Sequence, residues 1–174
     1  PHWLVAPTAD QRELRIDWIQ LSASGDPPDA SFLDACAAHD VCLSFRHGHI
    51  PSEADDPYRT WSARRPELAR PSEVQVFPQA QDAWRSLLRR SAQGATDPTA
   101  MTLDNLQRWA AQTPLFVALN FTPDTVRDQA RALAARGVAG LSLVLGPGPG
   151  ADPHVHTFEA QGALDVIRAL AAPD

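Results

Sequence analysis

The sequence predicts an α/β fold, with a predominantly parallel sheet and crossover helices. Short apolar runs of strand length alternate with segments of helical period, and turn-forming residues separate them. With 174 residues the chain has the length of one domain, so we expect a single α/β domain over 1–174. Two arrangements fit this order of elements, a small or irregular TIM-barrel-like fold and an open doubly wound sheet.

Strands are predicted where a short apolar run ends in polar or turn-forming residues. In order along the chain they cover residues 3–6, 16–21, 41–45, 74–77, 115–121 and 138–145. Helices are predicted where apolar residues recur at helical spacing behind a capping residue, such as Asp29 or Ser31, Thr102, and Thr122 followed by Pro123. They cover residues 29–39, 81–90, 102–109, 122–137 and 158–171.

Residues 50–72 interrupt this alternation. The segment is rich in proline and charge, with Tyr58 and Trp61 embedded, and it shows no sustained period of either kind. We interpret it as a Pro-rich excursion, because long loops in compact domains are often lids or binding loops. Tyr58 and Trp61 would then be exposed aromatic anchors for a ligand or a protein partner.

All fifteen basic residues are arginine, since the chain contains no lysine. This excludes a Walker A loop, Schiff-base aldolases and pyridoxal phosphate enzymes, each of which needs a lysine. The formal net charge of −6 argues against nucleic acid as a partner. Cys36 and Cys42 are too few for a disulfide framework, and no apolar run is long enough for a membrane span. We therefore expect a cytoplasmic protein with no membrane partner, and the start at Pro1 suggests a chain processed or excised from something longer.

Candidate site residues follow the strand ends, because α/β folds place their sites beyond the carboxyl ends of parallel strands. Two His-X-His pairs stand there, His47 with His49 and His154 with His156. Alternate residues of an extended segment point to one face, so each pair could offer two imidazoles to one metal ion. The shell could be completed by nearby acids, namely Asp152, Glu53, Asp55 and Asp56. Such an ion, Zn, Mn or Fe, would activate a water for hydrolysis. The alternative is that both pairs belong to ordinary surface loops.

Three further features suggest catalysis or anion binding. Arg46 stands at a strand end and could clamp an anion, while Asp17 is an acid within an apolar strand, which is costly unless paired or functional. We therefore take His47, Arg46 and Asp17 as candidate catalytic residues. The loop with Gly146, Gly148 and Gly150 could present backbone N–H groups to an anion, although its two prolines remove two donors.

Three local resemblances bear on function. Arg46-His47-Gly48 resembles the Arg-His-Gly motif of histidine phosphatases, which implies His47 as the phosphorylated nucleophile and Arg46 as a phosphate clamp. The segment 152–157 is similar to the Asp-X-His-X-His segment of amidohydrolases and PHP-type phosphoesterases, whose histidines bind metal. The rhythm of 16–21, 116–137 and 140–147 resembles small phosphate-binding barrels such as thiamine phosphate synthase, but Ser-Ala-Ser replaces the Arg and Lys expected after Ile-Gln-Leu.

Together these features predict a small α/β enzyme, a hydrolase or lyase acting on a small anionic, phosphorylated molecule with the help of a divalent metal ion. One alternative is a non-catalytic, degenerate barrel-like binding module or complex subunit. The other is a histidine-phosphatase-like phosphohydrolase that uses His47.

Overall fold

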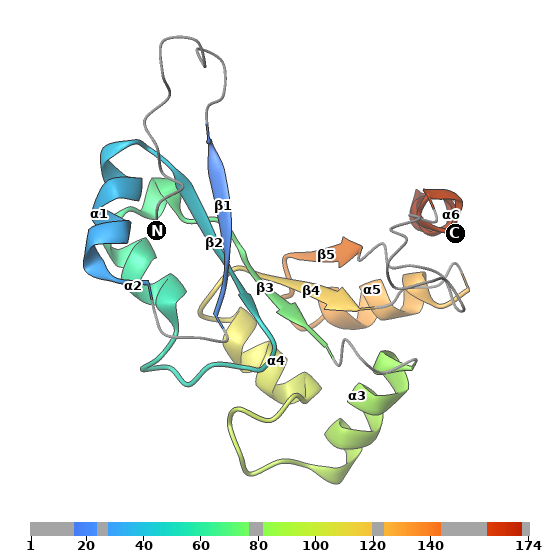
Figure 1. The fold of residues 1–174 in the computed structure, drawn as a ribbon. Coiled ribbons are helices and arrows are strands. Elements are labelled where there is room, and N and C mark those ends of the chain that lie inside the picture. The colour runs from blue at the N-terminus through green and yellow to red at the C-terminus, as the bar shows by residue number, and fades with distance from the viewer. Residues whose placement is uncertain (1–15, 24–27, 77–81, 120–123, 144–159, 172–174) are drawn as a thin grey trace, which may run out of the picture.

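The computed structural model describes residues 16–23, 28–76, 82–119, 124–143 and 160–171. Five parallel strands form one sheet in these ranges, in the order β1-β2-β3-β4-β5. The strands are β1 (Trp18–Ser22), β2 (Cys42–His47), β3 (Ser72–Gln75), β4 (Leu115–Leu119) and β5 (Gly140–Leu143). The helices are α1 (Ala30–Ala38), α2 (Pro57–Arg64), the 3₁₀ helix η1 (Pro66–Leu68), α3 (Ala83–Gln93), α4 (Leu103–Ala110), α5 (Val126–Ala134) and α6 (Ala160–Ala171). The predicted α/β fold with a parallel sheet is confirmed (Figure 1).

The strands follow one another across the sheet in sequence order. A doubly wound sheet needs a reversal in strand order, and the five described strands have none. Crossovers between parallel strands are right-handed, so crossovers that all step in one direction place their helices on the same face. This winding is the one found in (β/α) barrels, and among the described residues no helical layer covers the other face of the sheet.

The large buried apolar side chains of the sheet point to the helical face and form two clusters. One cluster joins β2 to α1, α2 and η1, and its most buried members include Leu43, Phe45 and Trp61. The second joins β3 and β4 to α3, α4 and α5, with Leu106 and Val117 fully buried. Alternation along each strand therefore separates a helix-covered face from an open face.

Several helices begin where their capping residues predict. The Asp29 carboxylate accepts a 2.7 Å hydrogen bond from the backbone N–H of Phe32, and the Thr102 hydroxyl accepts one of 3.3 Å from Asn105. These bonds satisfy N–H groups that have no partner inside the helix. Helix α5 begins later than predicted, at Val126, and the predicted cap pair 122–123 lies outside the described residues.

The interpretation of residues 50–72 as a loop is wrong over much of its length, because α2 and η1 lie within it. Trp61 is fully buried against α1 and β2, and Tyr58 is half-buried beside it. A single large apolar residue in eight gives no detectable helical period, so packing of Trp61 rather than sequence pattern decides this helix. Trp61 is therefore not an exposed anchor for a partner.

Two local details complete the fold. The helical spacing of Trp84, Leu87 and Leu88 predicts one buried stripe on α3, and this is corrected for Leu88, which is exposed while Leu87 is fully buried. Between β2 and β3, Leu43 pairs with Ala69 and Arg46 with Glu73, so β3 carries one extra residue, a β-bulge. Pro71 lies in this bulge, where the ladder needs no N–H.

The described helices contain none that is long and apolar enough to cross a membrane. The predicted strand at 3–6 lies outside the described residues.

Candidate functional site

A cavity of about 670 Å³ lies at the carboxyl ends of β1 and β2. Its wall is built from the last residues of these strands, the loop between β2 and α2, the first turn of α2, and Thr99. The carboxyl ends of parallel strands carry the site in α/β folds, so this cavity lies at the edge of the sheet where the site was expected. Its polar wall residues include His47, His49, Asp55 and Asp56.

His47 is the last residue of β2 and points to the helix-covered face, where it is 1% exposed. The rings of His47 and Trp109 pack edge to face, with their centroids 4.9 Å apart and their planes at 88°. Its Nε2 atom is buried and has no hydrogen-bond partner among the described residues. One imidazole nitrogen of a residue that lines the cavity, Nε2 of His47, is therefore available to a ligand.

Burial lowers the pKa of His47 to about 4, because the charged imidazolium would lose its hydration. The carboxylate of Asp56 opposes this shift, and His49 adds a smaller contribution in the same direction as burial. Above pH 5 the ring is therefore neutral. A neutral imidazole with one nitrogen unused can accept a hydrogen bond or a proton, or ligate a metal ion.

Asp56 connects the cavity wall to α4. It caps α2, where its Oδ1 accepts a hydrogen bond of 3.0 Å from the backbone N–H of Tyr58. Its Oδ2 accepts hydrogen bonds from Trp109 Nε1 at 3.0 Å and Thr113 Oγ1 at 3.2 Å. Asp56 therefore fixes the indole against which His47 packs.

The sequence offered Asp56 only as a possible metal ligand, and it did not indicate Trp109 as a site residue. Asp56 followed by Pro57 is a capping residue with proline at the first helical position, a signal that could have located both the helix and the acid. Nothing in the sequence indicates that Trp109, 53 residues further along the chain, donates a hydrogen bond to this carboxylate.

Arg46 and Asp17 lie away from His47. Arg46 points to the open face, where its Nε lies 2.7 Å from Oε1 of Glu73. The expectation of a buried acid within the first strand is corrected, since Asp17 is exposed and precedes β1 at the amino edge of the sheet. The structure therefore does not bring the three candidate catalytic residues together. In particular, adjacent residues of a strand point to opposite faces, so Arg46 and His47 do not face one ligand as the histidine-phosphatase resemblance implies.

Only part of the predicted metal site can be located. His47 and His49 line the same cavity, so this His-X-His pair faces one space. Among the described residues no group of three His, Cys, Asp or Glu side chains is placed to hold a metal ion. His154, His156 and Asp152 lie outside the described residues, as do Gly146, Gly148 and Gly150.

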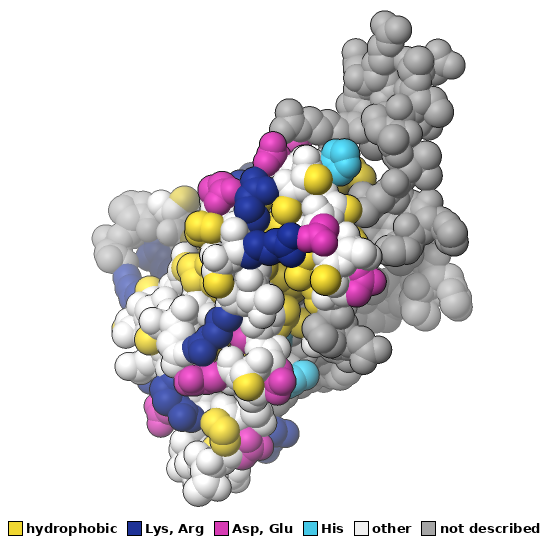
Figure 2. Space-filling view, turned by 90° about the vertical axis from the view of Figure 1, so that its left-hand side faces the viewer, with side chains coloured by type: hydrophobic (Ala, Val, Ile, Leu, Met, Phe, Trp, Pro, Cys, Tyr) yellow, Lys and Arg dark blue, Asp and Glu magenta, His cyan; other side chains and the backbone are white. Residues whose placement is uncertain are grey.

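The charges on the side of the molecule where α1 and α2 lie are of mixed sign (Figure 2). Arg64 pairs with Asp34, while Arg65 pairs with Asp40 at 2.8 Å and with Glu67 at 2.6 Å. On this face, basic side chains are therefore compensated by neighbouring acids rather than gathered into a basic patch.

Comparisons of the chain with protein-family models, with curated proteins and with solved structures found no match.

Proposed function

We propose that this chain is a small α/β enzyme, a hydrolase or lyase whose substrate binds in the cavity at the carboxyl ends of β1 and β2. The observation that carries the proposal is His47, a buried neutral imidazole with an unused Nε2 in the wall of that cavity. A buried polar atom without a partner costs free energy, so its retention suggests a role that a bound ligand completes.

In this proposal His47 accepts a proton from a substrate group or from a water beside it. The Asp56 carboxylate stabilises the imidazolium that forms, because it favours the charged ring. Trp109 holds the ring in one orientation by its edge-to-face contact, and Asp56 in turn holds Trp109. A positioned general base of this kind contributes roughly a hundredfold to ten-thousandfold in rate.

The described wall contains Asp55 and Asp56 but no arginine. An anionic substrate, as the sequence analysis expected, would meet repulsion from these carboxylates. For such a substrate we therefore propose a different use of the same nitrogen: His47 and His49 bind a divalent metal ion, with ligands from 152–156 completing the shell, and His47 is then a metal ligand and not the base. The ion would supply the positive charge that the wall lacks and would polarise the bond that is broken.

Metal analysis of the purified chain, together with turnover of a panel of phosphate and carboxylate esters, tests this proposal. We expect Zn, Mn or Fe near one equivalent, lost in His47→Ala and in His49→Ala. His39→Ala, which removes an exposed histidine at the end of α1, serves as the matched control and should keep the metal. Absence of metal from every preparation rejects the metal-assisted reaction. Undiminished turnover in His47→Ala rejects His47 as the base.

A further inference from the structure

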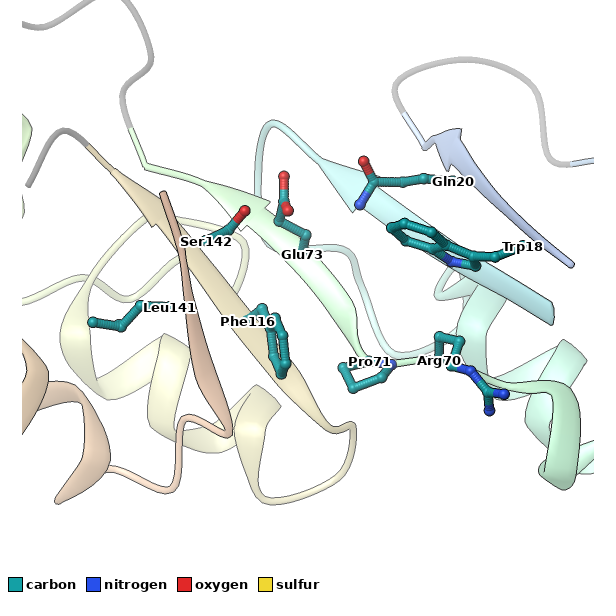
Figure 3. A pocket seen from close by; sticks show the side chains of 8 residues that line it. All are labelled: Trp18, Gln20, Arg70, Pro71, Glu73, Phe116, Leu141 and Ser142. Atoms are coloured by element: carbon teal, nitrogen blue, oxygen red, sulfur yellow. The ribbon is translucent and has the colours of Figure 1, made fainter. Parts of the chain in front are cut away.

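A second cavity, of about 610 Å³, lies on the open face of the sheet, on the side away from the helices (Figure 3). Its wall comes from β1, β3, β4, β5 and the segment leading into β3, and includes Trp18, Gln20, Arg70, Glu73, Phe116 and Ser142. Glu73 pairs in register with Arg46, one residue before His47, so alternation places this cavity on the opposite face from the His47 cavity. The proposed function uses none of these side chains.

Two aromatic rings border this cavity and are held in place. Trp18 is 56% exposed, and its Nε1 donates a hydrogen bond of 3.2 Å to Ser44 Oγ. Phe116 is 37% exposed and lies over Gly140, where an added Cβ would come within 2.9 Å of the ring. Large apolar side chains that are exposed together on one face often mark a binding surface, whereas a single exposed apolar side chain does not. The rings therefore offer flat apolar surfaces to a ligand.

Between these rings lies a buried acid, one of whose carboxylate oxygens accepts no hydrogen bond from the described residues. Glu73 is 6% exposed, and Arg46 Nε lies 2.7 Å from its Oε1. This contact lacks hydrogen-bond geometry, and Oε1 has no other hydrogen-bond partner among the described residues. A buried carboxylate oxygen in this state is stabilised by any ligand that donates an O–H or N–H to it.

We propose that this open-face cavity binds a sugar, a neutral ring that carries several hydroxyl groups. The wall carries one charge of each sign, Arg70 and Glu73. A cationic ligand would meet Arg70 and would compete with Arg46 for Glu73, and an anionic ligand would meet the Glu73 carboxylate, so a neutral ligand fits this wall best. A neutral hydroxyl donates to Glu73 Oε1 without breaking the ion pair. The C–H face of a sugar ring packs on Trp18 and Phe116, and Gln20 and Ser142 reach the remaining hydroxyls.

The test uses the indole N–H resonances of the ¹⁵N-labelled full chain, with that of Trp18 assigned from Trp18→Phe. The probes are glucose, galactose, mannose, xylose and N-acetylglucosamine and their disaccharides. We expect at least one to shift the Trp18 resonance with a dissociation constant in the millimolar range or tighter. The Trp84 resonance, from α3, should not move.

Two variants and one control locate the binding. Glu73→Gln should weaken binding at least tenfold by the Trp18 shift, and Leu88→Ala, which removes a comparably exposed apolar side chain from α3, should not. Trp18→Ala lacks that resonance, so its binding is followed through the NMR signals of the sugar, and it should also be at least tenfold weaker. Near-ultraviolet circular dichroism checks that each variant is folded. The proposal is overturned if no sugar shifts the Trp18 resonance, or if Glu73→Gln binds the sugar as tightly as the wild type does. It is also overturned if the Trp18 resonance shifts with the concentration of the protein and not with that of the sugar, because that shift reports self-association. None of these outcomes bears on the metal content or on His47, so the two proposals fail separately.

Discussion

Protonation of His47 should destabilise the folded chain in mildly acidic solution. In the unfolded chain the pKa of a histidine returns to about 6.5, whereas burial lowers the pKa of His47 to about 4 in the fold. Between these two values the unfolded state binds the proton and the folded state does not. The free energy of unfolding therefore rises with pH through the window from 4 to 6.5, and the contribution of His47 is constant above it.

The size of the effect follows from the two pKa values. Their difference of about 2.5, at about 1.36 kcal/mol for each pKa unit, sets a limit of about 3 kcal/mol. Most of this is lost before the native His47 itself becomes protonated, so the stability at pH 5 should be about 2 kcal/mol below that at pH 7. For a domain of this size, that is a large part of the total stability.

Urea unfolding at pH 5 and pH 7, followed by tryptophan fluorescence, measures this difference. His47→Phe keeps an aromatic ring against Trp109 but cannot titrate, so its difference between the two pH values should be smaller than the wild-type one by about 2 kcal/mol. His39→Gln leaves His47 in place and should retain the wild-type difference. If His47→Phe loses as much stability at pH 5 as the wild type, the buried neutral imidazole is refuted.

Three further substitutions test the packing that positions the site. Trp61→Ala should cost about 3–5 kcal/mol in urea unfolding, because it empties a fully buried position; a cost below about 1 kcal/mol would contradict its burial. Asp56→Ala removes the acceptor of three hydrogen bonds and leaves Trp109 Nε1 unsatisfied, so we expect the free energy of unfolding to fall by about 3 kcal/mol. Asp56→Asn keeps one acceptor oxygen, so its loss should be smaller. Thr102→Ala should cost about 1 kcal/mol through loss of the α4 cap, with Thr102→Ser restoring most of it; equal stability of Thr102→Ala and wild type would show that the cap contributes nothing.

Strand and helix positions were predictable where one side of an element is buried over most of its length. The strands at 41–45 and 115–121 and the helix from Thr102 each combine an apolar pattern with a clear boundary, and β2, β4 and α4 match them closely. Helix α2 lacks such a pattern, because only Trp61 is fully buried in it. Its helical conformation depends on the Asp56 cap and on packing against residues far away in the sequence.

The candidate site divides in the same way. The sequence indicated that chemistry would lie at the carboxyl ends of the strands and singled out His47, since a strand followed by polar residues is a local feature. The separation of Arg46 from His47 also follows from local alternation, but which face receives the helices depends on the direction of every crossover.

By itself the sequence determined the α/β class, the parallel strands and the exclusion of lysine-dependent chemistry, because periodicity, capping and composition are local properties. The tertiary structure alone decided that Trp61 belongs to the core, that Asp56 accepts a hydrogen bond from Trp109, and that burial lowers the pKa of His47. It also showed Glu73 and the two exposed rings sharing an open face. Each of these depends on distances between residues that lie far apart along the chain, and burial, charge and hydrogen bonding act through those distances.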